Sequence, residues 1–238
     1  MKNIVKRLEG KELTAENLLS VMTLEEKLGQ MFMLDFRRWK NREDSAQSDH
    51  QNFSPEVKEL IGKYGLGNVI LFAENFADIN QIVKFNHELK NSVVNGIPML
   101  IGVDQEGGRV VRTNDGCSMP GNMGIGATAD EENAYTNGYI IGKELKAVGI
   151  NCDFAPVLDV NNNPANPSCN LRSFSSDHKY AAKYGVKMAE YSHELTEAQY
   201  LLLGSIYYEC DSSKKAESLL KKVTGKSDSQ RKYTIFRQ

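Results

Sequence analysis

Charged side chains follow directly on an apolar segment at one point of this sequence. Residues 98–112 read PMLIGVDQEGGRVVR, an apolar run that leads into carboxylates, a glycine pair and guanidinium groups. The charged residues are Asp104, Glu106, Arg109 and Arg112. The Asp104 carboxylate could accept hydrogen bonds from vicinal hydroxyls of a sugar, and such charge-assisted bonds contribute about 1.5–3 kcal/mol each. The alternative is a strand-end turn closed by a salt bridge between one of these carboxylates and Arg109 or Arg112.

A second polar stretch, DVNNNPANPSCNLRSF, spans residues 159–174. Its asparagines and prolines are typical of a structured loop and not of a helix. The asparagine amides and Arg172 concentrate hydrogen-bond donors in a short segment, which suits a binding loop. The same composition also fits a surface loop whose asparagine side chains cap their own backbone, and the sequence leaves both interpretations open.

Apolar segments that precede such polar residues are predicted to be strands. They cover residues 29–36, 67–72, 98–104 and 150–160. Helical segments alternate with them at residues 14–30, 55–64, 78–95, 128–149 and 177–190. Apolar strands separated by helices indicate an α/β fold with a parallel sheet covered on both faces. This leaves a doubly wound sheet or a β/α barrel, and both place binding groups at the C-terminal ends of strands.

Residue types at the expected helix starts support these boundaries. Two segments carry the capping-box pattern, in which a threonine is followed three residues later by a glutamate. These pairs are Thr23 with Glu26 and Thr128 with Glu131. The remaining starts have a serine or aspartate cap, at Ser54 before Pro55, at Asp78 and at Asp177.

The pattern changes near residue 190. Residues 191–238 contain no apolar segment flanked by turn signals and read as a helical hairpin followed by a tail. Part of this stretch has the spacing of a single tetratricopeptide-like repeat, at Tyr200, Leu203, Gly204, Tyr207, Ala216 and Leu220. One repeat cannot bury its own apolar faces, so the hairpin either packs on the preceding domain or forms a docking surface.

The overall composition excludes several classes of function. The 238 residues carry 29 Lys and Arg against 31 Asp and Glu, so no basic face for nucleic acid is expected. No window approaches a membrane span, and the N-terminus lacks the apolar core of a signal peptide. The four cysteines are scattered without a CxxC pair, which predicts a reduced, cytoplasmic protein with no metal site and no other cofactor.

Several motifs together resemble one known family. GVDQEGGRVVR, FAPVLDVNNNPANP and RSFSSD, in this order, are similar to the N-terminal domain of family 3 glycoside hydrolases, in its β-N-acetylhexosaminidase branch. MTLEEKLGQMFM and GLGNVILFAENF fit the same family, so the resemblance covers about residues 20–190. It implies a TIM-type (β/α) barrel that hydrolyses β-linked N-acetylglucosamine, with retention, in saccharides such as peptidoglycan or chitin fragments.

The resemblance also implies roles for particular residues. Asp104 matches the aspartate that binds hydroxyls of the sugar, and Arg172 matches the arginine that holds the same sugar. Arg109 and Asp159 match further motif positions and are expected to support the site from the strand ends.

The groups that carry out catalysis in the family are not found in this sequence. The resemblance implies an aspartate nucleophile after a late strand and a histidine donor near a Lys-His-Phe-Pro-Gly-His-Gly motif. The chain contains neither Lys-His nor Pro-Gly-His, so no catalytic residue is assigned. The histidines, which are interpreted as surface residues, are His50, His87, His178 and His193.

The length of the chain limits the barrel to about half. Residues 191–238 cannot supply four more βα units of about 30 residues each, so residues 1–190 are predicted to form a partial barrel of about four units. An open sheet exposes two edges, which favours self-association or a second chain that completes the barrel. Three functions stay open: a hexosaminidase inactive in this truncated form, a non-catalytic sugar-binding remnant, and an interaction module acting through the tail.

Overall fold

The computed structural model describes residues 3–12, 14–37, 51–113 and 115–190, and these contain one parallel sheet. Its strands are β1 (Met33–Asp35), β2 (Asn68–Leu71), β3 (Leu100–Val103) and β4 (Cys152–Asp153). Neighbouring strands are parallel in the order β1-β2-β3-β4. The expected α/β fold with a parallel sheet is therefore confirmed. The predicted helical hairpin at 191–238 lies outside the described residues.

The strand order distinguishes between the two architectures that the sequence left open. A doubly wound sheet reverses its strand order at a switch point, whereas a β/α barrel adds strands in sequence order around its axis. The described strands follow sequence order without a reversal. This is the order of a β/α barrel.

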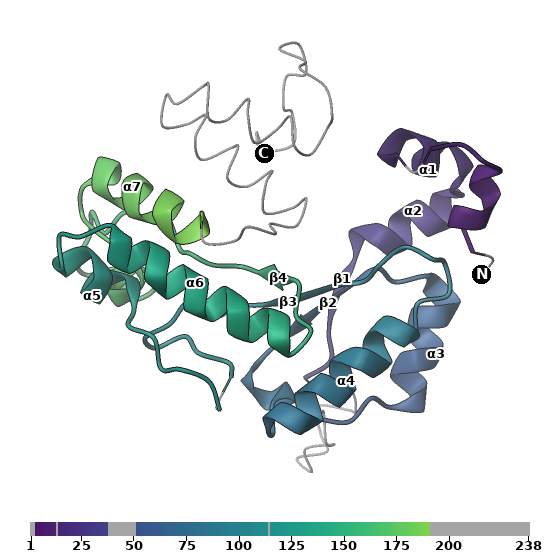
Figure 1. Cartoon of the computed structure of the whole chain (residues 1–238), viewed down its shortest axis with the longest axis horizontal. Coiled ribbons are helices and arrows are strands. Elements are labelled where there is room, and N and C mark those ends of the chain that lie inside the picture. Colours follow the sequence, from purple (N-terminus) through teal and green to yellow (C-terminus); the bar gives the residue numbers. More distant parts are fainter. Residues whose placement is uncertain (1–2, 13, 38–50, 114, 191–238) are drawn as a thin grey trace.

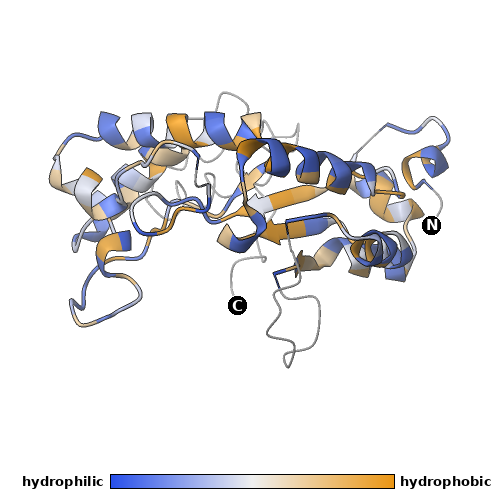
Figure 2. Ribbon diagram, turned by 90° about the horizontal axis from the view of Figure 1, so that it is seen from below, coloured by the Kyte–Doolittle hydropathy of each residue, from blue (hydrophilic) through white to orange (hydrophobic). Residues whose placement is uncertain are grey.

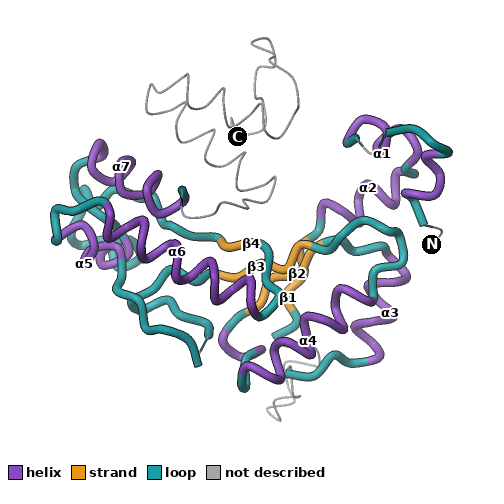
Figure 3. Tube along the Cα trace, in the orientation of Figure 1, coloured by secondary structure: helices purple, strands orange, loops and turns teal. Residues whose placement is uncertain are grey.

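Helices lie on both sides of the central strands (Figure 1). They are α1 (Ala15–Val21), α2 (Leu24–Met31), α3 (Pro55–Tyr64), α4 (Ile79–Asn91), α5 (Asn122–Ala127), α6 (Glu132–Ala147) and α7 (His178–Ala189). Short 3-10 turns are η1 (Val5–Leu8), η2 (Ala73–Asn75) and η3 (Asn170–Arg172). Figure 3 shows α1 to α4 gathered on one side of the strands and α5 to α7 on the other. None of the helices in the described part of the chain is long and apolar enough to cross a membrane.

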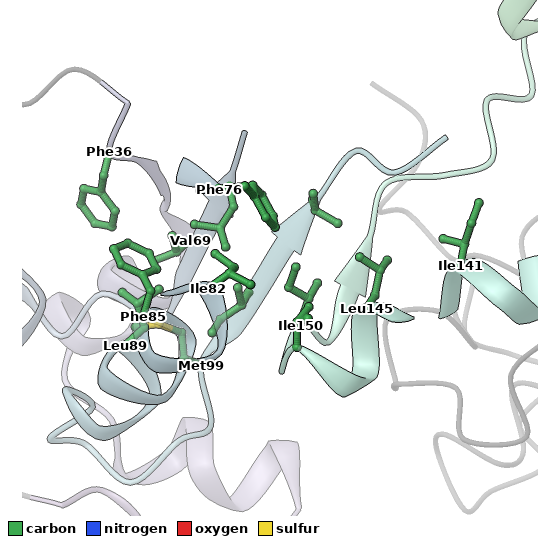
Figure 4. Close-up of a cluster of buried hydrophobic side chains, with 14 of the residues drawn as sticks. Phe36, Val69, Phe76, Ile82, Phe85, Leu89, Met99, Ile141, Leu145 and Ile150 are labelled. Atoms are coloured by element: carbon green, nitrogen blue, oxygen red, sulfur yellow. The ribbon is translucent and has the colours of Figure 1, made fainter. Parts of the chain in front are cut away.

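The core lies between the sheet and the helices that cover it. Side chains from β2, α4 and α6 converge there, as Figure 4 shows for Val69, Phe85 and Leu145. Ile82, Phe85 and Leu89 of α4 are all buried in this core. Removing side chains of this size from water stabilises a fold by about 1.5–3 kcal/mol each. Figure 2 shows the resulting contrast between hydrophobic strands and helices with hydrophilic outer faces.

Most predicted helix starts are confirmed. The Thr23 side chain accepts from the Glu26 N–H, and the Glu26 side chain accepts from the Thr23 N–H, which completes the capping box. The predicted caps Ser54, Asp78 and Asp177 likewise accept from N–H groups of their own first turn.

The prediction of a second capping box, at Thr128 and Glu131, is wrong. Thr128 does not cap α6, because its hydroxyl donates to the carbonyl of Ile125 at 2.7 Å and ends α5 instead. The sequence had not predicted α5. The α6 helix starts at Glu132 without a side-chain cap.

Other boundaries were also wrong. The predicted helix 14–30 is divided into α1 and α2, because Met22 is extended and Thr23 starts a new helix. The helix predicted to reach residue 95 ends at Asn91. The predicted strand 150–160 is reduced to Cys152–Asp153, and Pro156 beyond it has no N–H to donate to a neighbouring strand.

The α5 helix connects the core to the loop that ends at Arg172. The side-chain amide of Asn122 donates to the backbone carbonyl of Arg172 at 2.8 Å and to that of Val157 at 3.3 Å. Gly126 lies so close to Phe174 that a Cβ atom there would overlap the Phe174 carbonyl. A residue without a Cβ atom, glycine, is thus required at position 126 for α5 to hold this loop.

We expect Gly126→Ala to destabilise the protein by about 1–3 kcal/mol, because the added methyl group forces α5 away from Phe174. Gly124→Ala in the same helix is the matched control: its nearest neighbour would be Pro120 Cβ at 4.0 Å. That variant should be neutral or more stable by up to about 1 kcal/mol, because alanine favours helix. Urea unfolding measures both, and equal effects would contradict the packing described for α5.

Candidate functional site

The predicted site residues gather at the C-terminal ends of β3 and β4. Asp104 follows β3 directly, and the chain then turns back through Gly107 and Gly108, whose φ angles are 83° and 60°. The N–H of Gly108 donates to the carbonyl of Met119 at 2.8 Å. A Cβ atom on Gly108 would lie 2.7 Å from the Cα of Gly121. Glycine is needed here for both the left-handed backbone and the close approach.

A bidentate salt bridge joins this turn to the loop after β4. The Arg172 guanidinium donates from Nε to Glu106 Oε2 at 2.8 Å and from Nη2 to Glu106 Oε1 at 2.6 Å. Its Nη1 donates to the carbonyl of Ser168 at 3.1 Å. Glu106 is buried, whereas the Arg172 side chain is 41% exposed. The bridge therefore fixes the orientation of Arg172 while its side chain stays partly exposed.

Neighbouring carboxylates stabilise the charged form of Arg172. Its pKa is raised above the ordinary value chiefly by the hydrogen bonds to Glu106, and the charges of Asp159 and Asp104 add to this. These carboxylates therefore lie within electrostatic range of the guanidinium. The predicted neighbours Asp104, Asp159 and Arg172 are brought together by the fold.

Asp104 has its own guanidinium partner, and that partner is Arg112. Arg112 Nη2 lies 3.3 Å from Asp104 Oδ2, and both side chains are partly exposed. The Gln105 side chain holds the Arg112 segment, since its Oε1 accepts from the Arg112 N–H at 2.7 Å. Of the two arginines that the sequence offered for a strand-end salt bridge, the structure thus pairs Arg112. The Asp104 side chain stays 26% exposed beside this salt bridge.

The two supporting residues differ in their placement. Arg109 lies exposed beside Gly108 at the tip of the turn. Asp159 is also exposed, and its backbone carbonyl accepts from the Ser173 hydroxyl at 2.6 Å. Their supporting roles stay predictions.

The loop 159–174 combines both interpretations that the sequence left open. Asn163 accepts from the Ala165 N–H at 3.1 Å, and Asn166 accepts from the Ser168 N–H at 2.9 Å. These are the self-capping asparagine turns. The end of the same loop delivers Arg172 to the site. Self-capping stiffens the loop that carries the arginine.

Asp153 is a buried carboxyl under the site. It lies at the end of β4, is 8% exposed, and its Oδ1 accepts from the Gln105 N–H at 2.9 Å. The pKa of Asp153 is raised to about 8, chiefly by burial and in smaller part by the charges of Asp104 and Glu106, although the hydrogen bond from the Gln105 N–H lowers it. The group is therefore mostly protonated at pH 7.

Three of these residues were not assigned to the site from the sequence: Glu106, Arg112 and Asp153. The alternation of side chains between the two sides of an extended segment is the signal that could have identified Glu106. It lies two positions after Asp104, so an extended segment presents both to one side. Nothing local marks Asp153, because its environment comes from chain segments distant in sequence.

The histidines within the described residues lie on helix surfaces, as predicted. His87 is exposed on α4, where its Nε2 lies 2.8 Å from the Asn91 amide nitrogen. His178 is the first residue of α7 and is exposed. His50 and His193 lie outside the described residues.

The fold and the site together indicate a β/α-barrel type of protein with a binding site at its strand ends. Parallel strands in sequence order carry a cluster of carboxylates and guanidinium groups at their C-terminal ends, the position where β/α barrels bind substrates. Such a cluster suits hydrogen bonding to hydroxyl groups.

Comparison with known proteins identifies the family. The family model described as the glycosyl hydrolase family 3 N terminal domain matches residues 23–198. Beta-hexosaminidase A of Pseudoalteromonas piscicida is 40% identical over 177 residues, covering 69% of this chain and 30% of that protein. This chain belongs to glycosyl hydrolase family 3.

Solved structures agree with this assignment. A glycoside hydrolase family 3 beta-N-acetylglucosaminidase from Paenibacillus sp. str. FPU-7 is similar with a TM-score of 0.63 and 37% identity, covering 71% of this chain and 30% of that chain. NagZ from Neisseria gonorrhoeae, in complex with N-trifluoroacetyl-D-glucosamine, has a TM-score of 0.56 and 26% identity, covering 68% of this chain and 46% of that chain. The family and branch inferred from the motifs are confirmed. This chain spans less than half the length of these relatives.

The raised pKa of Asp153 predicts a pH-dependent stability. Its ordinary value is 3.8 and its folded value about 8, so folding takes up a proton between these pH values. The stability from this group is full below pH 3.8 and falls as the pH rises to about 8. Asp153→Asn should remove that fall, gaining roughly 1–4 kcal/mol on the wild type between pH 4 and pH 8.

Urea unfolding at both pH values measures this difference. Asp159→Asn, at an exposed aspartate of the same region, is the control and should follow the wild type. A constant difference between Asp153→Asn and the wild type at both pH values would show that Asp153 is ionised in the folded protein.

Proposed function

We propose that this chain carries the sugar-holding part of a family 3 β-N-acetylhexosaminidase that acts on β-linked N-acetylglucosamine. The observation that carries the proposal is the pair of fixed, partly exposed groups at the strand ends, Asp104 beside Arg112 and Arg172 on Glu106. The relatives that are hexosaminidases and glucosaminidases support the choice of sugar.

Each group has a distinct role in holding the sugar. Asp104 accepts hydrogen bonds from two sugar hydroxyls, and Arg112 forms an ion pair with its carboxylate. Arg172 donates to a sugar oxygen from the side of its guanidinium that Glu106 does not occupy. Asp153 is neutral beneath them, which limits the repulsion among neighbouring carboxylates.

Cleavage needs two further groups. Hydrolysis with retention requires a nucleophile and a proton donor on either side of the glycosidic bond. No catalytic residue is assigned in this chain, because the motifs that carry these groups are not found in its sequence. We therefore propose that the chain by itself binds the sugar without cleaving it. Action through residues 191–238 as an interaction module is the alternative that the sequence offers.

Sugar binding tests this function. The full chain should bind N-acetylglucosamine with millimolar affinity by titration calorimetry, and Asp104→Ala should weaken binding at least about tenfold, because charge-assisted bonds are lost. Asp115→Ala, in the same loop, is the control and should bind as the wild type does. Release of nitrophenol from a β-N-acetylglucosaminide should stay at the buffer rate. Equal affinity for both variants would refute the role of Asp104, and turnover that depends on Asp104 would refute inactivity.

We also propose that further strands, from a second copy or another chain, complete the barrel. Within the described residues β1 and β4 each pair with one neighbour and form the sheet edges. Phe154, which covers Gly102, is 46% exposed. Sedimentation velocity at micromolar concentration should show a dimer, and Phe154→Ser should shift it towards monomer. A monomer that stays compact and soluble at every concentration would argue against self-association.

A further inference from the structure

The Phe72 ring is close to two guanidinium groups. The Cζ of Arg37 is 3.5 Å from the ring centroid, and the Cζ of Arg112 is 5.4 Å from it. Phe72 directly follows β2, Arg37 follows β1 and Arg112 follows β3. The ring therefore links the C-terminal ends of three neighbouring strands. A cation over an aromatic face at these distances is attracted by the ring quadrupole.

Each guanidinium also has a carboxylate partner. Arg37 donates from Nε to Asp35 Oδ2 at 2.7 Å, and its Nη2 lies 2.6 Å from the same oxygen. The hydrogen bonds to Asp35 are the chief reason why the pKa of Arg37 is raised, and the charge of Asp104 contributes. Asp35, Arg37, Phe72, Arg112 and Asp104 thus form one chain of contacts that ends at the sugar-holding carboxylate.

Hydrogen bonds hold the backbone of Phe72. The Phe72 N–H donates to the Asn75 side chain at 2.9 Å, and the Asn75 N–H donates to the Phe72 carbonyl at 2.8 Å. Asn75 is fully buried. These bonds fix the backbone that carries the ring.

Few polar contacts among the described residues fix the orientation of the Arg112 guanidinium. Its ion pair with Asp104 is long, at 3.3 Å, and its Nε is buried without a hydrogen-bond partner among the described residues. A single long ion pair leaves a flexible arginine with several rotamers. The aromatic face restricts those rotamers without occupying a hydrogen-bonding group of Asp104.

We propose that Phe72, whose ring also contacts Arg37, is a positioning residue that holds Arg112 against Asp104 and so prepares Asp104 for the sugar. This inference rests on the proposed function, because its consequence is measured as sugar affinity. Phe72 and Arg37 act through Arg112, and the proposal gives them no contact with the sugar.

The first measurement tests the stack without any sugar. In NMR spectra of the full chain with labelled arginine, the Arg112 side-chain signals should show a ring-current shift. Phe72→Leu keeps an apolar side chain but removes the ring, so it should abolish that shift. Phe72→Tyr keeps the ring and should preserve it. An Arg112 signal that is unchanged in Phe72→Leu would overturn the proposal.

The second measurement is the affinity for N-acetylglucosamine. Phe72→Leu should weaken binding about three- to tenfold, Arg37→Ala should weaken it less, and Phe72→Tyr should restore it to within about twofold of the wild type. In an Asp104→Ala background, Phe72→Leu should cause no further loss, because its effect passes through Asp104. A merely structural role would lower the melting temperature and would add to the Asp104→Ala effect.

The outcomes separate the two proposals. If the wild type binds the sugar and Phe72→Leu binds it equally well, the positioning role is wrong and the proposed function stands. If the wild type does not bind the sugar, the proposed function is wrong and Phe72 has no sugar site to prepare. The NMR shift then decides only whether the ring holds Arg112.

Discussion

The site depends on the buried carboxylate of Glu106 and its pairing with Arg172. A carboxylate removed from water is strongly destabilising unless a partner replaces its hydration, and a guanidinium that donates two parallel hydrogen bonds does so well. The partners are 66 positions apart in the sequence. Their pairing therefore requires that the turn after β3 and the loop after β4 reach the same point, and α5 holds the second loop there through Asn122.

The neighbouring acidic groups are neutralised in two ways. Glu106, Asp104 and Asp35 each have an arginine partner. Asp153 has none among the described residues and keeps its proton instead, since burial and nearby negative charge make its ionised form unfavourable. Three carboxylates of this region thus form ion pairs with arginines, whereas the buried Asp153 has a raised pKa instead. The site is thus acidic in composition but balanced in charge.

Local sequence patterns predicted most of the helices and strands, but they did not predict which side chains distant in sequence pair with each other. Ser54, Asp78 and Asp177 cap helices within four residues of themselves, and a local pattern is enough to find them. Thr128 has the same local pattern, yet the unpredicted helix α5 ends there and takes its hydroxyl. Asp104 and Arg172 came from motif resemblance. The choice of Arg112 over Arg109, and the partner of Arg172, depend on where a tight turn points each side chain.

The close approach of Gly108 to Gly121 has a wider consequence. It locks the segment after β3 onto the start of α5, and α5 in turn holds the segment that carries Arg172. The segments that carry Asp104 and Arg172, the two groups of the proposed sugar site, are thereby held to each other through α5. A shift of either segment would therefore shift the other, so the distance between the two groups is set by backbone packing and not by their own side chains.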